Sequence, residues 1–91
     1  MELGLFDLPG VRLGMLLMPR GSYRKERLEK EGDGRVYAVF AGRLSIQTCD
    51  GARPRRTLVV SPGSPVVLDT PGSYHVTADQ HSVGVRGVRC V

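Results

Sequence analysis

The most informative shortage in this sequence is of long apolar stretches. Nowhere among its 91 residues do about 18 apolar residues follow one another, so we expect no membrane-spanning helix and no membrane partner. The first residues, 1–4, lack the basic and apolar regions of a signal peptide. Tryptophan is absent and aromatic residues make up only 5%. With 41% apolar and 24% charged residues, the chain is nevertheless globular and not disordered.

Cysteine and histidine are scarce as well. Cys49 and Cys90 lie in distant parts of the chain, and we expect two free thiols instead of a structural disulfide. The two histidines, His75 and His81, form no closely spaced set with them, so the pattern is not that of a zinc site. We therefore predict no metal and no other cofactor.

Positive charge gathers in two segments of a chain with net charge +4 and a pI of about 9.6. The first, 24–27, is balanced by neighbouring glutamates. The second is an uncompensated basic loop with Arg53, Arg55 and Arg56, a candidate contact for phosphates. Because no aromatic residue lies beside this loop to stack on bases, we interpret it as a solvated hairpin tip and expect no direct contact with DNA.

Glycine and proline interrupt the chain at regular intervals, at pairs such as Pro62-Gly63 and Pro71-Gly72. Short β-prone runs lie between them, and this pattern predicts one all-β domain over residues 1–91. No helical period persists, and we interpret Ser22–Glu31 as a charged strand followed by a Gly-Asp-Gly turn. A domain of this size has a small core, so pairing with a second copy is expected.

Two runs, 11–18 and 36–41, carry apolar residues on both faces of a strand. A strand of this kind needs cover on its outer side, from another strand or from a partner subunit. The residues that we place toward the core are Val11, Leu13, Met15, Leu17, Val36, Ala38 and Phe40. The opposite face supplies the predicted centre of a homodimer interface, namely Leu16, Met18, Tyr37 and Val39.

The second half of the chain has simpler runs. Leu44 and Ile46 alternate with polar residues and are expected inside the barrel. Further short strands are expected at 57–60, 66–68 and 74–78. The last run, 83–91, changes register at Gly87, where we predict a β-bulge.

The order of these features from residue 35 to residue 91 resembles the cupin barrel. One strand ends in a small residue and a glycine, and a later turn, Pro71–His75, looks like the second cupin motif with Thr70 in place of its proline. The resemblance implies a small jelly-roll-like β-barrel. The residues that carry it are Gly42, Pro71, Gly72, Tyr74 and His75.

In cupin enzymes the first motif supplies two histidines and a carboxylate to a metal. The corresponding positions here fall near Glu29, Glu31 and Arg35, and none of them matches. A cation in place of a carboxylate repels a metal ion. We therefore predict no metal site and no catalytic residue, and we do not favour an irregular site of Glu29, Glu31 and His75.

An enzymatic alternative rests on His75. Metal-independent cupin epimerases and ketoisomerases use a histidine base together with further histidines and a tyrosine. This alternative requires a ligand-sized cavity beside His75 that Tyr37 or Tyr74 faces. We favour a structural role for the histidine and barrel packing for the two tyrosines. A small-ligand-binding cupin is the other alternative.

Among cupins without metal ligands, the chain looks most like the C-terminal dimerisation domain of centromere protein C. The similar segments are 11–19, 22–30, 36–42 and 71–74, whereas the hairpin at 48–56 is longer and more basic. The resemblance implies a non-enzymatic homodimer that forms the C-terminal part of a longer kinetochore scaffold. It further implies kinetochore or chromatin partners, bivalent binding and a place at the centromere in the nucleus, with the cytoplasm as the alternative.

Overall fold

The computed structural model describes residues 2–8, 10–30, 32–48 and 56–89, which form nine β-strands and no helix. None of these residues thus belongs to a helix that is long and apolar enough to cross a membrane. The prediction of an all-β chain is confirmed. In chain order the strands are β1 (Glu2–Leu8), β2 (Val11–Met18), β3 (Tyr23–Leu28), β4 (Gly34–Ala41), β5 (Leu44–Thr48), β6 (Thr57–Val60), β7 (Val66–Leu68), β8 (Gly72–Ala78) and β9 (Ser82–Arg89).

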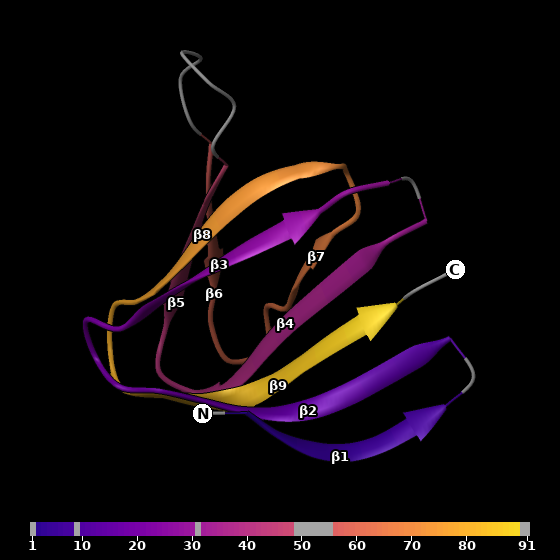
Figure 1. Ribbon diagram of the computed structural model, residues 1–91. Helices are drawn as coiled ribbons and strands as arrows, with labels where there is room; N and C mark the ends of the chain where they lie inside the picture. The colour runs from indigo at the N-terminus through magenta and orange to yellow at the C-terminus, as the bar shows by residue number, and fades with distance from the viewer. Residues whose placement is uncertain (1, 9, 31, 49–55, 90–91) are drawn as a thin grey trace.

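The strands form two antiparallel sheets that face each other and curl around a shared interior (Figure 1). The five-stranded sheet has the order β1-β2-β9-β4-β7, and the four-stranded sheet has the order β3-β8-β5-β6. The last strand, β9, lies at the centre of the five-stranded sheet, between β2 and β4. Strands from both ends of the sequence therefore meet in one sheet.

The core lies between the inner faces of the two sheets. Leu44 and Ile46 are fully buried there, as their alternation predicted. The remaining apolar residues of the core are Leu16, Met18, Leu28, Tyr37, Val39, Val60, Leu68, Tyr74, Val76 and Ala78. Most strands contribute alternate residues to it, as expected of a sheet with one covered face.

The inner and outer faces of β2 and β4 are the reverse of the prediction. The four residues that were expected to centre a homodimer interface are only 0–4% exposed and belong to the core of a single chain. They are Leu16, Met18, Tyr37 and Val39. Phe40, which was expected to fill the barrel, is 65% exposed. The sequence pattern fixed the alternation correctly but not its direction, because both faces of these strands are apolar.

Other expectations about strands have mixed outcomes. The charged segment Ser22–Glu31 does form a strand, β3, as predicted. The bulge expected at Gly87 is wrong, because Gly87 pairs in regular register with Leu13 and with Val36. Irregularities lie instead in β4 and in β1, a strand that the sequence pattern did not predict.

A tight contact between two turns closes one end of the barrel. Gly42, between β4 and β5, has a φ of 95°, and a Cβ atom there would lie 2.4 Å from the His81 carbonyl oxygen. The backbone N–H of Arg43 donates to Oγ of Ser82 over 3.0 Å. A glycine is required here both for its backbone conformation and for the space.

We expect Gly42→Ala to destabilise the fold by about 2–4 kcal/mol, since it combines left-handed strain with a backbone clash. Gly63→Ala is the matched control: Gly63 has a φ of 83° but no atom within 4 Å of its missing Cβ. The control is expected to cost only ~1 kcal/mol. Urea unfolding measures both, and equal losses would contradict the role of the turn contact.

Candidate functional site

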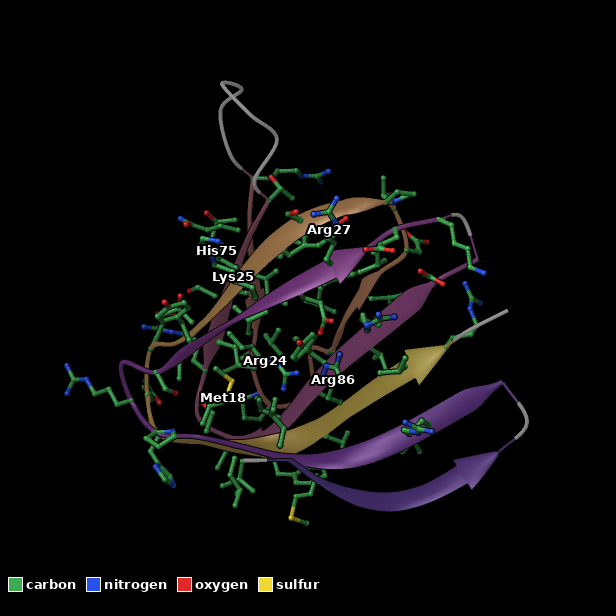
Figure 2. The ribbon with its side chains drawn as sticks, viewed as in Figure 1. Met18, Arg24, Lys25, Arg27, His75 and Arg86 are labelled. Atoms are coloured by element: carbon green, nitrogen blue, oxygen red, sulfur yellow. The ribbon has the colours of Figure 1, made fainter. Side chains whose placement is uncertain are left out.

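The charged strand β3 places polar side chains inside the barrel. Its alternation turns Arg24, Glu26 and Leu28 toward the interior, whereas Lys25 and Arg27 are exposed (Figure 2). Leu28 determines which face of β3 points inward, because its side chain packs in the core. Arg24 and Glu26 lie on the same face of the strand as Leu28 and therefore also point inward.

The carboxylate of Glu26 is the centre of a buried hydrogen-bond network. The Tyr37 hydroxyl donates to Oε1 over 2.5 Å. Arg86 donates from Nε to Oε1 and from Nη2 to Oε2, each over 2.8 Å, and Nε of Arg35 donates to Oε2 over 3.0 Å. Glu26 belongs to the four-stranded sheet and its three partners to the five-stranded sheet, so one carboxylate ties the two sheets together.

The network fixes the protonation states of its members. Burial alone would raise the pKa of Glu26, but hydrogen bonds from Arg86 and Tyr37 and the charge of Arg86 lower it to about 2. Burial and the hydrogen bond to Glu26 both raise the pKa of Tyr37. Burial opposes the charged form of Arg86, yet its bond to Glu26 raises the pKa overall. At neutral pH, Glu26 is thus an anion and Tyr37 is neutral.

The positions aligned with cupin metal ligands do not converge. Glu29 is exposed and pairs with Arg27 at 3.7 Å, Arg35 is engaged with Glu26, and Glu31 lies outside the described residues. Among residues 2–8, 10–30, 32–48 and 56–89, no group of three or more histidine, cysteine, aspartate or glutamate side chains is arranged to hold a metal.

His75 lies on the outer face of β8, while its neighbours Tyr74 and Val76 point into the core. Its ring is near that of exposed Tyr23, with 6.4 Å between the centroids. The hypothesis that His75 acts as a base inside the barrel is therefore wrong, since the sheet separates it from the interior. Tyr37 and Tyr74 do face inward, but not toward this histidine.

The other residues that carried the cupin resemblance shape turns. Pro71 and Gly72 lead from β7 into β8, and the Tyr74 hydroxyl donates to the Thr70 carbonyl oxygen over 2.6 Å. Gly42 makes the turn contact described above. These residues build the fold and expose no reactive group.

Most of the predicted basic loop lies outside the described residues. Arg53 and Arg55 belong to the segment 49–55, as does Cys49, and Cys90 is likewise outside. Arg56 is exposed, and its backbone pairs with Thr48 at the base of the hairpin. The prediction that this loop is a solvated tip remains a prediction.

The outer face of the five-stranded sheet is apolar. Phe40 and Val67 are 65% and 63% exposed, whereas most of the neighbouring side chains are half-buried. The apolar residues on this outer face are Val11, Leu13, Met15, Leu17, Val36, Ala38, Phe40, Val67, Val83 and Val85. Exposed apolar patches of this kind commonly mark interaction sites.

A groove of about 250 Å³ opens on this face near the start of β4. Gly87 forms part of its lining, and a Cβ atom there would lie 2.6 Å from Cγ1 of Val36 and 3.0 Å from Cδ2 of Leu13. Val11 and Val67 also line the groove, and Asp69 and Arg89 add charges. The side chains of Val36 and Leu13 therefore close over Gly87 and leave no space for a Cβ atom there, so the groove has an apolar lining at this point.

Sequence reasoning missed the buried network. The sequence pattern indicates only that glutamates balance the charge of segment 24–27, and it does not single out Glu26 or Arg86. A usable signal was the spacing from Leu28, because residues two and four positions before a buried leucine in a strand share its face. That rule places Glu26 and Arg24 inside.

No protein-family model and no curated protein matches this chain in sequence. Solved structures match it in fold. A cupin superfamily protein from Desulfitobacterium hafniense has a TM-score of 0.79 and 10% identity, over 100% of this chain and 77% of its own. The Cnp3 cupin domain of Schizosaccharomyces pombe has a TM-score of 0.74 and 13% identity, over 99% of this chain and 60% of its own.

Ectoine synthase from P. lautus also matches, with a TM-score of 0.70 and 18% identity, over 88% of this chain and 54% of its own. At such identities the likeness concerns the fold alone, which is the jelly-roll-like fold of cupins. Since the matches include an enzyme as well as a protein named only by its cupin domain, the fold does not by itself define an activity.

We expect Glu26→Gln to destabilise the fold by about 3–5 kcal/mol at neutral pH, because Arg35 and Arg86 would stay buried without their anion. A carboxylate with a lowered pKa stabilises the folded state above its ordinary pKa. In the wild type this contribution is fully present above about pH 4.5 and is lost as the pH falls toward 2.

Urea unfolding between pH 7 and pH 2 checks this. The variant should lose most of the dependence on pH in that window, whereas Glu29→Gln, which changes an exposed carboxylate, should keep it. A Glu26→Gln profile parallel to the wild type would contradict the network's role.

Proposed function

We propose that this chain is a non-enzymatic self-association domain in which two copies pair through the outer face of the five-stranded sheet. The observation that supports the proposal is the exposure of the large apolar side chains of Phe40 and Val67 on an apolar sheet face. Covering such side chains in a dimer removes them from water and is favourable by about 25 cal/mol per Å² of apolar surface. The occupant is a second copy because the face offers both a projection and a recess.

The projection is Phe40 and the recess is the groove beside Val36 and Gly87. The groove, at about 250 Å³, is larger than the cavity of about 150 Å³ that holds a benzene molecule. Phe40 lies four residues after Val36 on β4, about 13 Å along the strand. A two-fold axis near Ala38 and Val85 would seat each Phe40 in the other copy's groove, as an isologous interface requires.

The interior supports a non-enzymatic role. Glu26 accepts hydrogen bonds from three side chains, and its pKa of about 2 makes it a poor proton acceptor at neutral pH. Tyr37, held by the same network, is a poor proton donor. Glu26 and its partners thus stabilise the packing of the two sheets against each other.

The domain would belong to a centromere protein C-like kinetochore scaffold in the nucleus. The segments 11–19, 36–42 and 71–74 favour this parent, and the chain shares its fold with cupin domains such as that of Cnp3. In this role pairing joins two copies of the scaffold, so that two arms bind kinetochore or chromatin partners together. The chain spans 60% of the Cnp3 domain structure.

We expect the wild-type chain to sediment as a dimer and Phe40→Glu to sediment as a folded monomer, because a charge would face the apolar groove. Val67→Glu, at the groove itself, should have the same effect. Val59→Glu is the matched control, since Val59 is 49% exposed but lies on the outer face of the other sheet. This variant should remain a dimer.

A wild-type monomer at micromolar concentration would overturn the proposal, as would a dimeric Phe40→Glu. Leu16→Glu and Met18→Glu serve a different purpose. Both residues are in the core, so these variants should unfold and not yield folded monomers.

A second experiment tests bivalency. Fused to a weak nucleosome-binding arm, the wild-type chain should raise the apparent affinity for nucleosome arrays about 10²-fold or more through effective concentration. The Phe40→Glu fusion should bind like the isolated arm. Equal affinities of the two fusions would contradict a role in avidity.

A further inference from the structure

The interior of the barrel contains more positive than negative charge. Arg24, Arg35 and Arg86 all lie on inner-facing positions, and Glu26 is the buried carboxylate among them. Glu26 is committed to Arg86, Arg35 and Tyr37. A carboxylate offers about four acceptor positions, and these bonds fill them. One cation is therefore left without a carboxylate.

That cation is Arg24. Its Nε atom is buried and donates no hydrogen bond, which makes it the one such side-chain nitrogen or oxygen within the described parts of the chain. The positive charge of Arg24 opposes the rise in the pKa of Tyr37, as does that of Arg86, whose Nε lies 3.3 Å from the tyrosine hydroxyl. Figure 2 shows Arg24 reaching from β3 toward the interior.

An arrangement of this kind is costly without a ligand. A buried donor with no acceptor loses its hydration without replacement, and a buried cation loses far more. In native structures such groups are rare, and a bound water or ion is one of the explanations for them. Arg24 as a whole residue is only partly buried, so part of it is open to solvent.

We propose that the barrel interior binds a small carboxylate whose oxygens accept hydrogen bonds from the guanidinium of Arg24. The two oxygens of a carboxylate match two adjacent N–H groups of one guanidinium in a bidentate pair. The ligand would accept hydrogen bonds from Arg24 and balance its charge, as Glu26 does for Arg86. One negative charge suffices, because Arg86 and Arg35 already have their anion.

This site is independent of self-association. Arg24 occupies an inner-facing position of β3, whereas Phe40 and the groove lie on the outer face of the other sheet. The monomeric Phe40→Glu variant should therefore bind the carboxylate as well as the wild type does, and either proposal can fail without the other.

The experiment compares thermal unfolding in sodium acetate with unfolding in sodium chloride and sodium phosphate at equal ionic strength. At an acetate concentration ten times its Kd, the wild-type Tm should rise by roughly 7 °C above the chloride value. Arg24→Met, which keeps an apolar chain of similar length, should lose this rise. Arg27→Met is the matched control on the same strand, because Arg27 is exposed and faces outward.

A direct measurement covers the case in which Arg24→Met does not fold. In the wild type, the NMR resonance of the Arg24 Nε–H should shift with acetate and saturate, while that of Arg27 stays in place. Equal effects of chloride and acetate would mean an adventitious ion only and would overturn the proposal. So would a response to phosphate alone, or an acetate effect that survives in Arg24→Met.

Discussion

The join between the two sheets depends on a single carboxylate. Glu26 reaches across the barrel to Tyr37, Arg35 and Arg86, and these bonds link β3 to β4 and β9. They also fix the register of β3, because a shift by one residue would turn Glu26 to solvent and bury its basic neighbours. An apolar core alone would specify this arrangement less strictly.

The architecture could be predicted from the sequence because turns and alternation are local signals. Most strands after the first, including the charged β3, follow from glycine and proline punctuation and from period-two patterns. Local patterns do not always show which face of a strand points into the core. In β2 and β4 both faces are apolar, so Leu16 and Met15 look equally suited to the core. What settles the choice is long-range: Tyr37 must meet Glu26, a residue of the other sheet, and no local pattern encodes that meeting.

The candidate site was harder to predict for the same reason. His75 was a candidate because histidine is a common catalytic residue. In β8, however, it alternates with inward-facing neighbours and points outward, beside Tyr23. Arg24 and Glu26 did not stand out because segment 24–27 is nearly neutral together with its neighbouring glutamates. Their spacing of four and two residues before Leu28 predicts that they share its inward face. On this barrel the buried charged groups face inward and the exposed apolar surface faces outward, so the two proposed roles, carboxylate binding and self-association, have separate locations.

The central place of β9 has a consequence for how the chain folds. Residues of β9 pair with residues from 11 to 18 on one side and from 34 to 41 on the other, so contacts far apart in sequence dominate the larger sheet. Closing such loops before gaining their contacts makes folding slow. Until β9 has been synthesised, β2 and β4 have open edges where their central partner belongs. A nascent chain therefore exposes one open edge on each of two strands, and these edges need shielding from other chains.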